Sequence, residues 1–200
     1  MTDYEAPAIK ARERLIEAAR NLFHERGYNR TSIEHILRAS KVARSNFYYH
    51  FKGKRELAAA VFEAQVGRYR DKVLATTLKN PQLTALDRFN NFLAVMLDAQ
   101  AHWGARRGSF FGNFAHEFGA SDTQVRHAVA TFYRALEYAV AECLADGTLN
   151  GVFRVDIEPQ VLSRVVVAGL EGATLIAKAQ NDLNFLTSVA EGLKKLVVSQ

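Results

Sequence analysis

The residues best suited to chemistry lie between Arg44 and Lys54, where polar, hydroxylated and cationic side chains surround two phenylalanines. Asparagine can bond adenine through two hydrogen bonds, arginine can do the same with guanine, and tyrosine and lysine suit phosphate oxygens. Once Phe47 and Phe51 point into a core, most of their neighbours must point outward. The outward set predicts contact with duplex DNA, and it comprises Arg44, Ser45, Asn46, Tyr48, Tyr49, His50, Lys52 and Lys54.

Two short helices are expected to position this set. Thr31 followed three residues later by Glu34 has the pattern of a capping box, which predicts a helix from Thr31 to about Ala39. A second helix is predicted over about 44–51, after a short turn. Two helices joined in this way form a helix-turn-helix, whose second helix enters the major groove.

The charge distribution agrees with a polyanion-facing segment at the start of the chain. Residues 1–56 hold 12 Lys and Arg against 7 Asp and Glu, whereas residues 57–200 hold 14 of each. The whole formal charge of +5 therefore lies in the first quarter of the chain. A merely solvated basic face would give the same charge, so the motifs must decide between the two interpretations.

Length and composition point to a globular protein of 200 residues, with 48% apolar and 24% charged residues. No run approaches the roughly 18 apolar residues of a membrane span, and no secretory signal is visible, so a cytoplasmic location is expected. Cys143 is alone, which excludes an intrachain disulfide or a zinc-finger cluster. The Asn29–Thr31 sequon is then a chance match.

The predicted fold class is all-α, with an N-terminal three-helix unit and a larger C-terminal helical domain. Prolines are scarce, and no convincing strand pattern appears. Beyond the two short helices, the helices are expected over about 9–26, 54–78, 83–102, 108–118, 122–145, 159–179 and 183–198. A turn is expected at 146–151, which contains two glycines.

The run from Thr31 to Leu57 resembles the DNA-binding domain of TetR-family repressors. Its most diagnostic part is Phe47-Tyr48-Tyr49-His50-Phe51-Lys52, and the preceding Leu22-Phe23 and Gly27-Tyr28 fit the same pattern. The resemblance implies base-edge and nearby phosphate contacts by Arg44, Ser45 and Asn46. It implies phosphate contacts by Tyr48, His50 and Lys54, and a helix cap against the backbone at Thr31 or Ser32. Tyr49 is left open between a DNA contact and a packing role.

Three residues depart from the family pattern. Lys41 stands where glycine is frequent, and a left-handed lysine costs about 1–2 kcal/mol. Ala43 replaces a Ser or Thr cap that contributes about 0.5–2 kcal/mol. Ser45 stands where glycine is frequent, and its hydroxyl adds a potential base contact. These changes affect turn geometry and operator preference.

The resemblance also divides the chain into a DNA-binding domain over 1–56 and an effector-binding and dimerisation domain over 57–200, linked through the helix at 54–78. It implies that the last two helices pair with their copies in a homodimer, beside their packing within the chain. The residues expected at that interface are Val165, Gly169, Gly172, Ile176, Leu186 and Leu193.

The aromatic middle helices suggest either plain core packing or an effector pocket, and family members commonly hold a pocket in this region. The expected lining is Phe92, Met96, Trp103, Phe110, Asn113, Phe114, His116, Phe118 and Tyr133. Residues 107–113 resemble a segment that carries Cys in place of Ser109 in electrophile-sensing members. The expected effector is therefore a non-covalent, largely apolar small molecule that releases a repressor from a palindromic operator.

Two other classes compete with a DNA-binding regulator: a helical enzyme, and a protein-binding adaptor that does not bind DNA. The sequence contains no H-E-x-x-H, G-x-S-x-G, P-loop or G-x-G-x-x-G motif. His116, Glu117 and His127 lack a recognised metal-ligand spacing, and Cys143 has the surroundings of a small buried residue. No catalytic role, cofactor or metal is therefore expected, and duplex DNA, an effector and a second copy are the expected partners.

Overall fold

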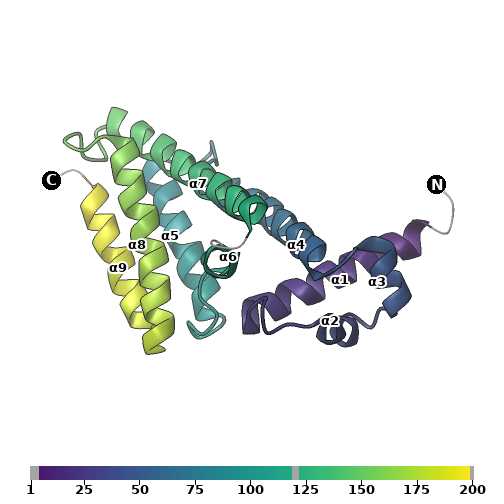
Figure 1. Ribbon diagram of the computed structural model, residues 1–200. Coiled ribbons are helices and arrows are strands. Elements are labelled where there is room, and N and C mark those ends of the chain that lie inside the picture. The colour runs from purple at the N-terminus through teal and green to yellow at the C-terminus, as the bar shows by residue number, and fades with distance from the viewer. Residues whose placement is uncertain (1–4, 119–121, 199–200) are drawn as a thin grey trace.

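The computed structural model describes residues 5–118 and 122–198, with side chains from residue 10 onward. It confirms the all-α fold class, since the only β pairing in these ranges is an isolated bridge between Phe153 and Val198. The α-helices are α1 (Glu5–Arg26), α2 (Ile33–Ser40), α3 (Arg44–His50), α4 (Lys54–Tyr69), α5 (Ala85–Ala101), α6 (Phe110–Phe118), α7 (Thr123–Leu149), α8 (Pro159–Gln180) and α9 (Leu183–Val197). Figure 1 shows α1–α3 at one end, α8 and α9 at the other, and α4 running between them.

The N-terminal unit is held by a small apolar core. Apolar residues of α1 and α2 meet Phe47 and Phe51 from α3 and its end, and all of them are almost fully buried. Because α3 has only seven residues, burial of these two rings fixes which of its faces points outward.

The cap of α2 differs from the prediction. Ser32, not Thr31, is the N-cap, and its hydroxyl accepts a hydrogen bond from the backbone nitrogen of His35. The reciprocal bond runs from the backbone nitrogen of Ser32 to the ring of His35, so histidine takes the place expected for Glu34. A capping box is therefore present, but it begins one residue later.

The turn between α2 and α3 contains two of the three departures from the family pattern, Lys41 and Ala43. Lys41 adopts a left-handed conformation with φ of 54°, which most residues avoid. Ala43 is the N-cap of α3 and supplies no side-chain hydrogen bond. The turn is therefore built without the glycine and hydroxyl that would stabilise it.

The helix expected over 54–78 is interrupted. The α-helix α4 ends at Tyr69, and a π-helical turn follows over Arg70–Leu74. A π turn inside a helix accommodates one extra residue, a feature that hydrophobic periodicity does not reveal.

The glycine-rich turn predicted at 146–151 begins too early, because α7 continues to Leu149. Gly147 lies within this helix, and the ring of Phe153 lies against it. A Cβ at Gly147 would lie only 2.0 Å from that ring, so the glycine serves close packing and not a turn.

Helix α8 is the one described helix that is long and apolar enough to cross a membrane by length and composition. One of its faces packs on α7 and α9. The opposite face leaves four large apolar side chains exposed, which are Val161, Val165, Leu175 and Ile176.

Candidate DNA-binding surface and polar cleft

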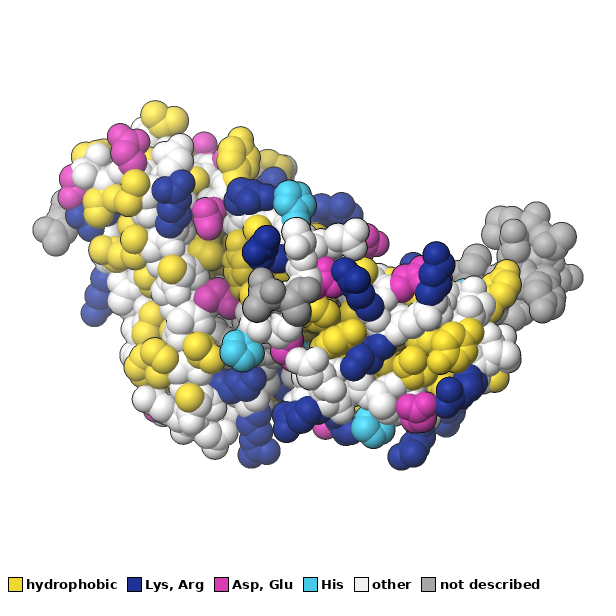
Figure 2. Space-filling model, viewed as in Figure 1, with side chains coloured by type: hydrophobic (Ala, Val, Ile, Leu, Met, Phe, Trp, Pro, Cys, Tyr) yellow, Lys and Arg dark blue, Asp and Glu magenta, His cyan; other side chains and the backbone are white. Residues whose placement is uncertain are grey.

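Helix α3 presents polar and aromatic side chains to solvent while Phe47 anchors it. Ser45 and Asn46 are exposed at its first turn. Tyr48 and Tyr49 follow, with 49% and 74% of their surface exposed, whereas Phe47 is fully buried. Figure 2 shows Lys and Arg side chains distributed over the unit formed by α1–α3. This combination suits a helix that reads base edges between phosphate contacts.

Arg44 begins α3 and pairs with the carboxylate of Glu34 across the turn, at 2.6 Å. Both side chains are more than half exposed, so solvent screens the pair and it contributes little to stability. The arginine can therefore exchange this partner for a guanine or a phosphate at small cost. His50, at the end of the same helix, is half-buried and lies against the ring of Tyr49.

Two residues that were predicted to face DNA or to cap a helix use their side chains for hydrogen bonds to backbone carbonyls of the protein itself. Thr31 is only 1% exposed, and its hydroxyl donates to the carbonyl of Gly27 at 2.7 Å. The ammonium of Lys54 donates to the carbonyls of Tyr28 and Thr31, at 2.9 and 2.8 Å, and lies over the Tyr28 ring. Burial lowers the pKa of Lys54. The structure thus assigns both side chains to the loop between α1 and α2, whereas Lys52 is exposed.

The aromatic residues expected to line a pocket mostly fill the interior instead. Phe92, Phe110, Phe114 and Phe118 are all at most 7% exposed. The rings of Phe110, Phe114 and Phe118 stack in sequence along α6. Close-packed rings leave no room for a ligand among them.

The two other apolar residues of the expected pocket are also engaged elsewhere. Met96 packs beside this aromatic core, and its sulfur accepts a hydrogen bond from the Tyr69 hydroxyl at 3.4 Å. Trp103 lies at the surface with 37% exposure, and the guanidinium of Arg107 stacks on it. Neither residue lines a cavity within the aromatic core.

Three residues of the expected pocket, Asn113, His116 and Tyr133, do come together in a cleft of about 980 Å³. Its walls are the end of α1 with the following turn, α6 with the segment before it, α8, and Tyr133 from α7. The sequence did not predict most of its polar lining, which includes His24, Arg106, Ser109, Glu171 and Lys178. Glu171 had a visible signal, because it is the only acidic residue within α8.

The floor of the cleft is a hydrogen-bonded carboxyl group. Ser109 donates its hydroxyl to Glu171 at 2.9 Å, and the hydroxyl of Tyr133 lies near enough to this carboxyl to lower its pKa. Burial raises the pKa of Glu171, and the two hydroxyls partly oppose that shift. Burial raises the pKa of Tyr133 as well, so its hydroxyl stays protonated.

Another edge of the cleft joins α6 to the turn after α1. The carboxylate of Glu117 accepts hydrogen bonds from the backbone nitrogens of Tyr28 and Asn29, at 2.9 and 2.7 Å. Gly27 permits this approach, since its φ is +86° and a Cβ there would lie 2.7 Å from the carboxylate. Nearby, the ring of His24 hydrogen-bonds to the carbonyl of Gly108 at 2.9 Å. Burial lowers the pKa of this histidine, which favours its neutral form.

The residues expected at a dimer interface divide into two groups. Val165 and Ile176 are exposed on α8, and Gly172 has open space where a side chain would project. In contrast, Leu186 and Leu193 are at most 6% exposed and pack within the chain. Gly169 faces Leu193, whose side chain lies 3.4 Å from the position of an added Cβ. These last three residues therefore belong to intrachain packing of α8 and α9.

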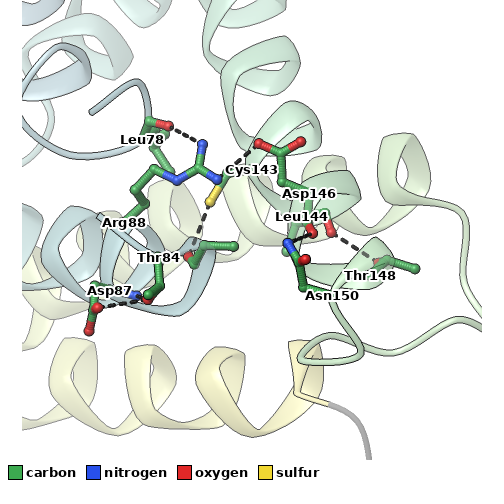
Figure 3. Close-up of polar contacts among 10 residues, drawn as sticks. Leu78, Thr84, Asp87, Arg88, Cys143, Leu144, Asp146, Thr148 and Asn150 are labelled. Carbon is green, nitrogen blue, oxygen red and sulfur yellow. Dashed lines mark hydrogen bonds and ion pairs between the residues drawn. The ribbon is translucent and has the colours of Figure 1, made fainter. Parts of the chain in front are cut away.

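The single cysteine lies in a separate polar cluster (Figure 3), where α5 meets α7. Its thiol donates to the carbonyl of Ala85 at 3.4 Å, while Arg88 pairs with Asp146 at 2.9 Å. Burial raises the pKa of Cys143 to about 11, so the reactive thiolate is suppressed. Within residues 5–118 and 122–198, no group of three His, Cys, Asp or Glu residues is arranged to hold a metal ion.

Comparisons with known proteins agree with this architecture. Residues 15–61 match the family model described as bacterial regulatory proteins, tetR family, and residues 85–193 match the tetracyclin repressor-like C-terminal domain.

Individual relatives match over most of their length. The transcriptional regulator AcuR of Cereibacter sphaeroides is 28% identical over 86% of this chain and 78% of its own. The HTH-type transcriptional repressor DhaR of a Mycobacterium species is 25% identical over 91% of both chains. A crystal structure of a regulatory protein TetR from Rhodobacter sphaeroides superposes with a TM-score of 0.86, at 27% identity over 94% of this chain and 99% of that one. The chain therefore belongs to the TetR family of DNA-binding transcriptional regulators.

Proposed function

We propose that this protein is a repressor that binds an inverted repeat in operator DNA as a homodimer and is released by a small molecule. The exposed face of α3 carries the proposal, because Asn46, Tyr48 and Tyr49 project from a helix that Phe47 anchors. Residues 1–56 form the DNA-binding domain in this proposal, and residues 57–200 form the effector-binding and dimerisation domain. Operator binding implies a cytoplasmic location.

On the DNA side, Asn46, Arg44 and Ser45 read base edges. Tyr48, Tyr49 and Lys52 are exposed beside them and bind phosphates. This division follows from chemistry, since amide and guanidinium groups match base edges, whereas hydroxyls and ammonium groups match phosphate oxygens.

On the opposite side, the exposed apolar stripe of α8 pairs with its copy. This stripe consists of Val161, Val165, the open side of Gly172, and Ile176. In that order the residues follow one another at steps of four, seven and four, which places them on one face of the helix. Two-fold symmetry then requires an operator with matching symmetry, with half-sites about 34–36 Å or a multiple apart.

Selection from a random pool of duplexes, followed by affinity measurement at several salt concentrations, tests the proposal. Each phosphate contact contributes about −0.9 to the slope of log affinity against log salt. Lys52→Ala should flatten this slope and weaken all sequences alike. Asn46→Ala should relax base preference at one position by about 1–3 kcal/mol. Wild-type behaviour of both variants on every duplex would contradict the proposal.

The dimer has its own test in sedimentation. Ile176→Glu should shift the protein to monomer at micromolar concentration and weaken operator binding, because it places charge within an apolar contact. Leu149→Glu is the matched control, since Leu149 is 86% exposed and lies outside the stripe. A wild-type protein that is monomeric and still binds one half-site tightly would exclude the dimer.

An enzymatic function is not proposed, because the matched relatives are transcriptional regulators. The polar cleft is assigned to ligand binding in place of the apolar pocket expected from sequence, because the aromatic residues of that pocket are packed together.

A further inference from the structure

The cleft has opposite chemistry at its floor and at its mouth. At the floor, Glu171 accepts a hydrogen bond from Ser109, and the hydroxyl of Tyr133 lies near the same carboxyl. Among the described residues, no Lys or Arg pairs with this carboxyl. A carboxylate has about four acceptor positions, so two hydroxyl partners leave room for a further donor.

Gly112 brings this carboxyl unusually close to α6. A Cβ at Gly112 would lie 2.8 Å from the second carboxyl oxygen of Glu171, so any larger residue would have to displace it. Glu171 is therefore held between α6 and α8 at a defined depth, with its outer side turned to the cleft that it lines.

The mouth of the cleft carries cations. Lys178 lies two turns after Glu171 on the same face of α8, which separates their backbones by about 10 Å. Its side chain crosses Gly108, and its ammonium lies 3.4 Å from the amide oxygen of Asn113. The exposed Arg106 also lines the cleft, and neither Lys178 nor Arg106 forms an ion pair with a carboxylate in the described part of the chain. The one exposed carboxylate of the lining, Glu25, is paired with Arg26 and Arg107. Ammonium and guanidinium groups bind carboxylates through charge-assisted hydrogen bonds.

We infer that the cleft binds a small carboxylic acid that also carries a hydroxyl or amino group. The ligand carboxylate binds Lys178 and Arg106 at the mouth, and its hydroxyl or amino group donates to Glu171 at the floor. A purely apolar molecule would exclude water from both sets of polar groups without replacing the hydrogen bonds to that water, at a cost in binding free energy. This inference rests on the proposed ligand-responsive function and specifies the chemical class of the ligand.

The position of the cleft gives such a ligand a route to the DNA-binding unit. His24, Gly27 and Asn29, from α1 and the turn after it, line the same space as Glu171 and Lys178 from α8. A ligand that prefers a different spacing between these walls shifts the α1–α3 unit by as much as its affinities for the two arrangements differ.

Calorimetric titration without DNA tests the ligand class directly. The probes are 4-hydroxybutyrate, 4-aminobutyrate and their homologues up to about six carbons, chosen for the distance of about 10 Å along α8. Butyrate lacks the donor group, and 1,4-butanediol lacks the carboxylate. At least one bifunctional acid should bind about tenfold more tightly than both of these, since each omits one charge-assisted contact.

Two cleft variants locate the site. Glu171→Gln and Lys178→Met should each weaken the bifunctional acid about tenfold or more. Asp98→Asn and Lys79→Met are matched controls, because both residues are exposed and neither lines the cleft. Lys178 is exposed as well, so its variant retains the fold even if the Glu171 variant does not.

The outcomes separate this inference from the proposed function. If no bifunctional acid binds more tightly than butyrate and butanediol, or if both cleft variants bind it as the wild type does, the ligand class is wrong. That result leaves operator binding intact. If the wild-type protein binds no duplex at all while the acid still binds at the cleft, the proposed function fails and the ligand site stands.

Discussion

The aromatic core and the polar cleft share the helix α6 but differ in what they leave available. Phe110, Phe114 and Phe118 turn their rings inward and stack on one another. Ser109 and Asn113 on the same segment face a cleft of about 980 Å³. Large apolar side chains stabilise the fold most when they pack closely against one another. Polar groups remain in contact with solvent because burying them without partners is costly. The phenylalanines therefore support the cleft from behind, whereas polar residues and Tyr133 line it.

The largest effect is expected from emptying the core. Phe114→Ala should lower the free energy of unfolding by about 3–5 kcal/mol, because the removed ring leaves a cavity among packed neighbours. Leu175→Ala, an apolar truncation at the cleft where the side chain is 67% exposed, should change it by at most about 0.5 kcal/mol. Urea unfolding of both variants measures the difference. Similar losses for the two would show that the cleft is packed like the core.

The next effect concerns the backbone that Glu117 holds at the edge of the cleft. Gly27→Ala should destabilise the protein by about 1–3 kcal/mol, because φ of +86° strains alanine and its Cβ would meet the carboxylate. Gly67→Ala is the control, since it lies within α4 with open space around it and should stabilise the protein by up to about 1 kcal/mol. Equal thermal midpoints for the two variants would contradict a tightly held turn.

Two lysines near α3 differ in the same way, because Lys54 is hydrogen-bonded within the protein whereas Lys52 is exposed to solvent. Lys54→Ala should lower the free energy of unfolding by about 1–2 kcal/mol, because two backbone carbonyls lose their donor. Lys52→Ala, at an exposed position, should leave stability within about 0.5 kcal/mol and weaken DNA binding alone. Chemical denaturation without DNA tests this contrast. A stable Lys54 variant with reduced DNA affinity would restore the phosphate contact that the sequence predicted.

The sequence was sufficient to predict features set by local pattern. The four-residue spacing of Phe47 and Phe51, with polar residues between them, predicted which face of α3 points outward. The uninterrupted segments with helical periodicity predicted an all-α chain. Features that depend on distant partners were not predictable in this way. The partners of Lys54 lie 26 and 23 residues away, and those of Glu117 lie 89 and 88 residues away.

The cleft illustrates the same limit. Ser109 and Glu171 are 62 residues apart, so their contact exists only once α6 and α8 are packed together. Asn113, His116 and Tyr133 were predicted to line a pocket, and a lone acidic residue in the apolar helix α8 was a further local sign of this site. The aromatic residues were correctly recognised as a cluster, but their spacing could not reveal that they fill the space they enclose.

The smallest expected effect is a pH dependence that distinguishes the cleft floor from the core. Because burial raises the pKa of Glu171 in the folded protein, the protonated form is favoured by folding. Its contribution to stability is therefore fully present below the unfolded pKa and is lost as pH rises through the folded pKa. Glu171→Gln keeps a hydrogen-bonding side chain but cannot ionise, so the variant should gain stability relative to the wild type as pH rises across that interval.

Unfolding measured in urea at a series of pH values above about 4 covers this interval. Asp98→Asn serves as the control for an exposed acid. A difference between wild type and Glu171→Gln that stays constant with pH would show that the carboxyl has the same pKa in the folded and the unfolded protein. In that case the hydroxyls of Ser109 and Tyr133 would offset the effect of burial completely, and the floor would offer a ligand a charged acceptor at neutral pH.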